Sequence, residues 1–167
     1  MTLVLGREQA DRIAAEGRLG YPHECCGFLL GEWSDQGKRV RDIRPAENAR
    51  SDSPHNRYLI PPEAFLHAEK EARERSLEIV GFYHSHPDVE ARPSAFDRDH
   101  AWAGYSYVIV SVRGGAPRET RSWELKPDRS EFVEESLSIE EGPATESRGP
   151  ASEEKTPLRD PSLGGKS

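Results

Sequence analysis

The sequence lacks the long apolar runs that mark membrane and secreted proteins. No apolar stretch approaches the ~20 residues that a membrane-spanning helix needs. The segment 1–7 has no basic start, and its apolar run is too short for a signal peptide. We therefore expect no membrane partner and a cytoplasmic location.

Positive charge is scarce as well. The chain has 23 Lys and Arg against 30 Asp and Glu, which gives a formal net charge of −7 at pH 7. Nucleic acids and anionic membranes bind cationic surfaces. We therefore expect neither of them as a main partner.

Cysteine is limited to the neighbours Cys25 and Cys26. Adjacent Cα atoms lie ~3.8 Å apart across a trans peptide, whereas ordinary disulfides span ~4.4–6.8 Å. A bond between the two would be strained, so we predict two reduced thiols that pack within an apolar run. A redox or thiol-transfer role is the less simple interpretation.

The end of the chain has a different composition from the rest. Gly, Pro and Ser fill 12 of the 29 positions 139–167, where only Ile139, Leu158 and Leu163 are large and apolar. Such a segment buries too little apolar surface to offset its ordering entropy. We predict a folded domain over 1–138 and a disordered tail over 139–167. The tail contains Leu163-Gly164-Gly165, which resembles a processable diglycine terminus, although a flexible end is the simpler interpretation.

Helical and strand patterns alternate within the predicted domain. Apolar spacing predicts helices over 7–17, 62–75, 94–102 and 131–137, the second with Phe65, Leu66, Ala68 and Ala72 on its inner face. Short apolar or alternating runs predict strands over 25–30, 39–45, 57–60, 78–83, 105–112 and 120–125. The expected fold is α/β in the broad sense (α+β), with helices flanking a mixed central β-sheet.

Two histidines stand at the end of an apolar strand. Side chains alternate along a strand, so His84 and His86 share one face and Ser85 points to the other. Two imidazoles on one face can converge on one cation. A hydrolytic metal site also needs a third protein ligand and an open position for water.

Four carboxylates follow the histidines, and spacing alone does not choose among Asp88, Glu90, Asp97 and Asp99. Asp97 has additional support, because Ser94 is a good helix N-cap and Asp97 then lies in the first helical turn. An isolated Ser-x-x-Asp is most simply a capping pair. Its position ten residues after the paired histidines favours a ligand instead.

Two other metal motifs do not fit the sequence. A His-Glu-x-x-His helix is absent. The segment 84–88 resembles the opening of the metallo-β-lactamase signature, but Val89 stands where that signature has a ligating histidine.

The spacing His84-Ser85-His86, seven residues, Ser94, two residues and Asp97 matches the motif of the JAMM (MPN+) metallopeptidases. Glu24 stands before an apolar run, as the upstream glutamate of that motif does. The chain thus resembles this family over about residues 3–135, and most closely its small prokaryotic branch. The resemblance implies a JAMM/MPN-like fold with a cytidine-deaminase-like layering of sheet and helices.

The resemblance also implies a metal centre. His84, His86 and Asp97 would ligate one Zn²⁺ and leave its fourth position to water. An N/O donor set of this kind favours zinc over iron or manganese.

The remaining motif residues receive their roles from the same resemblance. Glu24 would take a proton from the water and pass it to the leaving amine, Ser94 would donate to the oxyanion, and Ser85 would fix the nearby backbone. Without the resemblance, Glu32 is an equal candidate for the base. His100 is more simply a surface histidine than a competing ligand.

Members of the small prokaryotic branch act on ubiquitin-like sulfur-carrier proteins of the ThiS/MoaD type. The resemblance therefore implies a zinc metallopeptidase that cuts a peptide or isopeptide bond after the carrier's C-terminal Gly-Gly, releasing cysteine or trimming the carrier. One alternative is a deubiquitinase-like isopeptidase on another ubiquitin-like modifier, and another is a non-catalytic MPN scaffold. The sequence leaves open which carrier is cut, which amine leaves and whether the chain forms a homodimer.

Overall fold

The computed structural model describes residues 1–49 and 58–142. The elements in chain order are β1 (Thr2–Gly6), α1 (Arg7–Gly20), β2 (Cys26–Ser34), β3 (Gly37–Ala46), α2 (Pro62–Glu74), β4 (Glu78–Pro87), α3 (Ala95–His100), β5 (Ser106–Arg113), β6 (Ala116–Leu125) and β7 (Phe132–Glu140). The predicted combination of a mixed sheet with flanking helices is confirmed.

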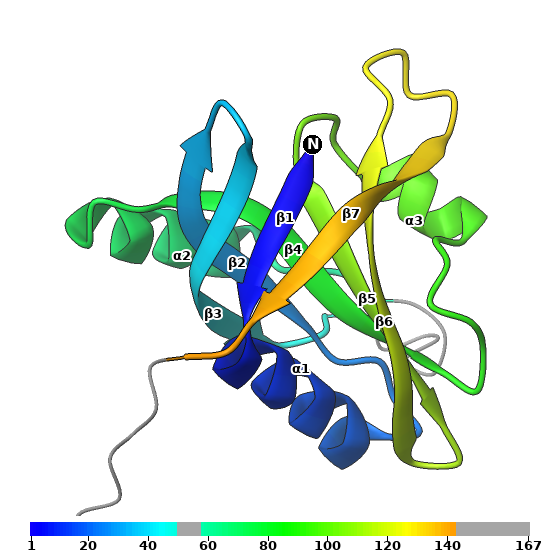
Figure 1. Cartoon of the computed structure of the whole chain (residues 1–167). Coiled ribbons are helices and arrows are strands. Elements are labelled where there is room, and N and C mark those ends of the chain that lie inside the picture. The colour runs from blue at the N-terminus through cyan, green and yellow to red at the C-terminus, as the bar shows by residue number, and fades with distance from the viewer. Residues whose placement is uncertain (50–57, 143–167) are drawn as a thin grey trace, which may run out of the picture.

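The strands close into a barrel in the order β1-β3-β2-β4-β5-β6-β7 (Figure 1). β1 closes the ring because it pairs in parallel with both β3 and β7. β4 and β5 are also parallel, and the other neighbouring strands are antiparallel. The sheet is therefore mixed, and its closure is a feature that the sequence did not predict.

The central strands β2, β4 and β5 are buried along most of their length, which explains their nearly continuous apolar sequences. On one face Val80 packs in a core that includes Ile13 of α1. The register of β4 against β2 shifts between Ile79 and Gly81, which interrupts the strand alternation at Val80. Phe82 therefore faces the other side, where it packs in a core that includes Ala68 and Ala72 of α2. β4 thus runs between α1 on one side and α2 on the other (Figure 1).

The C-terminal part of the domain differs from the prediction. The predicted helix over 131–137 is wrong, because positions 132–137 lie in strand β7. Burial along β7 alternates with the period of two that is typical of a strand: the less exposed residues are Glu135, Leu137 and Ile139. β7 also pairs with β1 and β6. The predicted domain boundary at 138 falls within β7. Positions 143–167 of the predicted tail lie outside the described residues, so its disorder stays a prediction.

Three smaller differences concern short segments. β1 was not predicted as a strand, although Leu3 and Leu5 are fully buried. The predicted strand over 57–60 is absent at positions 58–60, and position 57 lies outside the described residues. Leu66 was expected on the inner face of α2 but is 62% exposed, because the buried stripe of this helix runs through Ala68 and Ala72.

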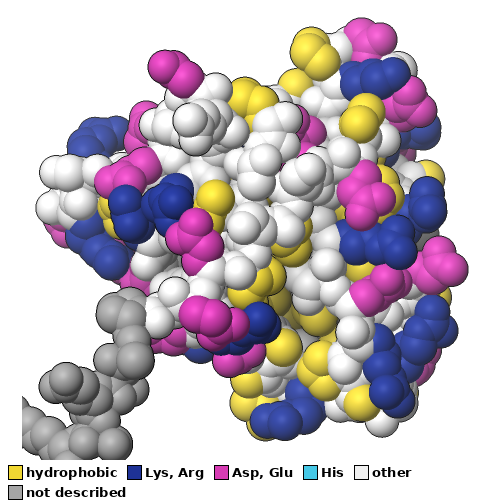
Figure 2. Space-filling model, in the orientation of Figure 1, with side chains coloured by type: hydrophobic (Ala, Val, Ile, Leu, Met, Phe, Trp, Pro, Cys, Tyr) yellow, Lys and Arg dark blue, Asp and Glu magenta, His cyan; other side chains and the backbone are white. Residues whose placement is uncertain are grey.

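The surface in Figure 2 carries acidic and basic side chains that are interspersed, with apolar atoms between them. Among the described residues, the helices are all too short or too polar to cross a bilayer.

Two apolar residues of α1 offer a test of the packing beneath β4. Ile13 is 1% exposed and Leu19 is 81% exposed. We expect Ile13→Ala to lower the free energy of unfolding by about 2–4 kcal/mol, because it leaves a cavity under the sheet. Leu19→Ala should change it by less than about 0.5 kcal/mol. Urea denaturation followed by circular dichroism measures both, and equal effects would contradict the assigned helix face.

Candidate active site

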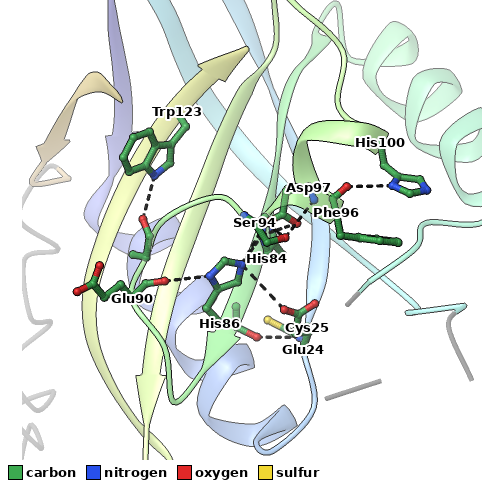
Figure 3. Close-up of polar contacts among 12 residues, drawn as sticks. Glu24, Cys25, His84, His86, Glu90, Ser94, Phe96, Asp97, His100 and Trp123 are labelled. Atoms are coloured by element: carbon green, nitrogen blue, oxygen red, sulfur yellow. Dashed lines mark hydrogen bonds and ion pairs between the residues drawn. The ribbon is translucent and has the colours of Figure 1, made fainter. Parts of the chain in front are cut away.

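β4 carries the two histidines to the end of the sheet. His84 and His86 lie on one face of the strand, are almost fully buried, and have ring centroids 4.9 Å apart (Figure 3). Ser85 points to the opposite face, toward α1. A Cβ atom added to Gly17 of α1 would lie 3.4 Å from the Cβ of Ser85. The strand alternation expected from the sequence therefore sets these three directions.

Asp97 reaches the histidines from the first turn of α3. Ser94 Oγ accepts a hydrogen bond from Asp97 N at 3.1 Å, and Asp97 Oδ2 accepts from Ser94 N at 2.6 Å and from Ser94 Oγ at 2.9 Å. The same carboxylate has Oδ1 3.4 Å from His84 Nε2 and Oδ2 3.3 Å from His86 Nε2. The capping pair and the contact with both histidines thus coexist, and the cap holds the carboxylate in place.

The spacing of these atoms suits a small tetrahedral cation. His84 Nε2 and His86 Nε2 lie 3.1 Å apart, so the three donor groups are separated by similar distances. Bonds of ~2.0–2.1 Å in a tetrahedral zinc site place neighbouring donors roughly 3.3–3.4 Å apart. Within the described residues, His84, His86 and Asp97 form a buried group that could hold a metal ion.

The charges in this group support one another. Burial opposes ionisation of Asp97, but the contacts with His84 and His86 hold the pKa of this carboxyl well below its usual range. Burial lowers the pKa of His84. For His86 the effect of burial is outweighed by the hydrogen bond to Asp97, which raises its pKa. An ionised Asp97 is the form that can ligate a cation.

The other candidate carboxylates lie elsewhere. Asp88 is exposed and accepts hydrogen bonds from the hydroxyl of Tyr21 and from Gly114 N. Glu90 and Asp99 are exposed. The structure therefore brings only one of the four carboxylates into the group.

Glu24 is the second carboxylate at the site. It is 6% exposed, and its Oε1 lies 4.0 Å from His86 Nε2 (Figure 3). Its Oε2 has no hydrogen-bond partner among the described residues, and burial raises its pKa to about 8. Glu32, an equal candidate by sequence, is exposed and pairs with Arg41.

The backbone around Glu24 is held by two polar side chains. Ser85 Oγ accepts from Cys25 N at 2.8 Å, and Ser85 N donates to Cys25 O at 3.1 Å. Asn48 Nδ2 donates to Glu24 O at 3.5 Å, and Asn48 Oδ1 accepts from Leu59 N at 3.0 Å. Sequence reasoning missed Asn48, because no local pattern shows that it lies between these segments.

An apolar pocket of about 540 Å³ adjoins the site. Its lining includes the carboxyl group of Asp97 and the imidazole of His100. The other lining residues are aromatic or aliphatic, except that two tyrosines carry a hydroxyl: Tyr58, Leu59, Ile60, Pro62, Phe65, Leu66, Phe82, Phe96, Trp102 and Tyr107. Tyr58 stacks on His84 with ring centroids 4.4 Å apart. Sequence reasoning missed this pocket, since its walls come from separate segments of the chain.

His100 and the two cysteines lie outside the group of His84, His86 and Asp97. His100 is exposed, and its ring stacks on Phe96 in the pocket wall. Cys25 and Cys26 are free thiols, and burial raises the pKa of Cys25 to about 11 and that of Cys26 further. Both thiols are protonated near neutral pH, which makes them poor nucleophiles.

Comparison with known proteins links this geometry to a family. A family model described as prokaryotic homologs of the JAB domain matches residues 7–126. The chain belongs to this family. The expected membership of the JAMM-type proteases is confirmed, and the protein is a hydrolase of the JAMM type.

Individual relatives within the prokaryotic JAB family and a solved structure agree. A desampylase from Haloferax volcanii is 34% identical over 117 residues, which cover 67% of this chain and 82% of the relative. A probable TtuB-protein conjugate cleaving protease from Thermus thermophilus is 34% identical over 85 residues, or 51% of this chain and 56% of the relative. The solution structure of a Salinibacter ruber protein matches with a TM-score of 0.64 and 42% identity, covering 87% of this chain and 94% of the other.

The contact between Ser85 and Cys25 gives a test of how this prokaryotic JAB domain positions Glu24. Ser85→Ala removes the acceptor of the Cys25 N–H, which we expect to cost about 1–3 kcal/mol of unfolding free energy. Turnover should fall while the amount of bound metal per chain stays the same. Ser122→Ala is the matched control. It also removes a buried hydroxyl, but that hydroxyl donates to Glu135, so turnover should stay unchanged. Loss of metal in Ser85→Ala would contradict this assignment.

Proposed function

We propose that the protein is a zinc-dependent protease that hydrolyses the peptide or isopeptide bond after the C-terminal Gly-Gly of a ubiquitin-like sulfur-carrier protein of the ThiS/MoaD type. The observation that carries this proposal is the buried group of His84, His86 and Asp97 with the Glu24 carboxylate beside it. The names of the two relatives, a desampylase and a protease for TtuB-protein conjugates, support a ubiquitin-like conjugate as the substrate.

His84, His86 and Asp97 are the residues that would hold the zinc ion. When bound, zinc supplies Lewis acidity, which polarises the scissile carbonyl and lets water attack near neutral pH. The protein's own contribution is to bury these three side chains together, where burial lowers the pKa of His84 and the contacts with both histidines keep Asp97 ionised.

Glu24 is the group that we assign to proton transfer. Its carboxylate is buried next to His86, and its Oε2 has no hydrogen-bond partner among the described residues, so it is free to accept a proton from the attacking water. The proton then passes to the departing amine as the C–N bond breaks. Burial favours the protonated form of Glu24, which helps this carboxyl to hold the proton between the two steps.

Ser94 is the group that we assign to the oxyanion. It is exposed at the start of α3, and its single hydroxyl proton is donated to Asp97 Oδ2. The hydroxyl can rotate toward a developing oxyanion while its oxygen still accepts from Asp97 N. The helix cap and the stabilisation of charge are therefore compatible.

Glu24→Gln tests the assignment of the base. This variant keeps the size of the side chain and should bind one zinc ion per chain, but cleavage of a carrier conjugate should fall by about 10²- to 10⁴-fold. Glu32→Gln is the matched control on an exposed carboxylate and should cleave normally. Zinc content by plasma mass spectrometry and cleavage by gel assay are the two measurements. Unchanged cleavage by Glu24→Gln would refute the role of Glu24.

The same assay separates the proposed substrate from its rivals. Purified sulfur carriers, ubiquitin and other diglycine modifiers, each conjugated to lysine, are offered to the zinc-loaded protein. Preference for ubiquitin or another modifier would favour a deubiquitinase-like isopeptidase. One bound zinc ion with no cleavage of any conjugate would favour a scaffold.

Ser94→Ala tests the oxyanion assignment against a purely structural cap. Loss of an oxyanion donor should lower kcat by about 10²- to 10³-fold with little change in KM. Loss of the cap alone should lower unfolding free energy by about 0.5–2 kcal/mol and leave kcat nearly intact. Ser94→Thr keeps both functions and serves as the control. A normal kcat in Ser94→Ala would leave Ser94 with only the cap.

A further inference from the structure

Exposed apolar side chains gather around the pocket beside the site. Leu59 is 43% exposed, Leu66 62% and Trp102 51%, and all three line this pocket. Large apolar residues that stay in contact with water around one cavity mark a binding surface. Asp97 belongs both to this lining and to the group of His84, His86 and Asp97, so the apolar surface directly adjoins that group.

The distance along β4 specifies which part of a substrate the pocket meets. Phe82, in the pocket wall, lies two residues before His84 on the same face of the strand, a separation of about 6.6 Å. An extended substrate also covers about 6.6–7 Å in two residues. When the scissile carbonyl of such a tail lies at His84, the side chain two residues earlier can enter the pocket. In a tail that is cut after Gly-Gly, this is the residue directly before the first glycine.

The chain itself carries a matching segment. Leu163 is directly followed by Gly164 and Gly165, and then by Lys166. Leu158 and Leu163 are the only large aliphatic residues in 143–167, and only Leu163 stands before the diglycine. The mostly apolar lining of the pocket suits an apolar side chain at this position, and two residues without a Cβ let the backbone come close to the buried group.

The length of the connection allows this segment to reach the site of its own domain. From Gly142, the last described residue, 21 residues lead to Leu163. Twenty-one residues span at most about 70 Å when fully extended. A domain of this size has a radius of gyration of about 14 Å, so the whole of its surface lies within reach. Tethering at this range gives an effective concentration of the order of millimolar.

We infer that the apolar pocket binds Leu163 of the same chain and that the site hydrolyses the Gly165–Lys166 peptide bond. Water adds its oxygen to the carbonyl carbon of Gly165, the C–N bond breaks, and the amine of Lys166 takes the proton. The products are a chain that ends in a Gly165 carboxylate and a fragment that begins at Lys166. This inference rests on the proposed protease function and adds to it a substrate and a requirement for an apolar residue before the diglycine.

Intact-mass spectrometry of the zinc-loaded full chain tests the cleavage. We expect loss of the residues after Gly165 at a rate that does not change when the protein is diluted. Leu163→Ser and Leu66→Ser should each slow this loss by at least about tenfold, because each removes apolar contact from one side of the pocket. Leu158→Ser in the tail and Leu19→Ser on α1 are the matched controls and should cleave at the original rate.

A carrier conjugate in the same tube separates this inference from the proposed function. If the conjugate is cut and the chain stays intact, self-processing is overturned and the protease function stands. If neither is cut, both fail. If Leu158→Ser slows the loss as much as Leu163→Ser, or if the rate rises with protein concentration, binding of Leu163 in the pocket of its own chain is overturned.

Binding gives a readout that does not depend on turnover. A labelled peptide of residues 156–165 is titrated into full-length Glu24→Gln protein, and its fluorescence polarisation is measured. The tethered Leu163 competes with the peptide, so the peptide should bind at least about tenfold more tightly when Leu163→Ser is added to this background. Equal affinities in the two proteins would overturn occupation of the pocket by the tail.

Discussion

The contact of Asp97 with His84 and His86 joins α3 to the end of β4. The helix cap at Ser94 and the burial of β4 both stabilise this contact. An ionised carboxylate and two imidazoles are costly to bury unless each has a partner of suitable charge or a hydrogen bond. The capping box supplies Asp97 with two donors from Ser94, and the strand fixes both rings on one face. The cores beneath α1 and α2 bury β4 on both sides, and only its two end residues are not fully buried.

The two buried carboxylates at the site have opposite electrostatic surroundings. Asp97 lies against both histidines and has its pKa held low, whereas Glu24 lies at the edge of the group, and burial raises its pKa to about 8. Paired acidic groups whose pKa values are separated in this way are suited to different tasks. The carboxylate that stays ionised suits a ligand, and the one that exchanges a proton near neutral pH suits a base. Geometry and electrostatics therefore agree on the division between Asp97 and Glu24.

The parts of the site that could be predicted from the sequence depend on local periodicity. The alternation of a strand orients His84, Ser85 and His86, and a helix cap orients Asp97, so no distant contact is needed for either. Glu24 required the family resemblance, because its neighbours Ser85 and Asn48 are distant in sequence. β7 was mistaken for a helix for a related reason: its pairing with β1, at the other end of the chain, decides its conformation. β1 itself is short, and only its place between β3 and β7 makes it a strand.

The pocket and Glu24 share an anchor in Asn48. Its amide holds the carbonyl of Glu24 through Nδ2 and the amide of Leu59 through Oδ1, and Ala49 N donates to Leu59 O beside it. Leu59 lines the pocket and Tyr58 stacks on His84. The same segment thus forms part of the apolar wall, contacts a histidine and is joined through Asn48 to the backbone of Glu24. The pocket wall and the backbone of Glu24 are therefore joined by the hydrogen bonds of one side chain, and the position of Leu59 relative to Glu24 depends on Asn48 as well as on the core.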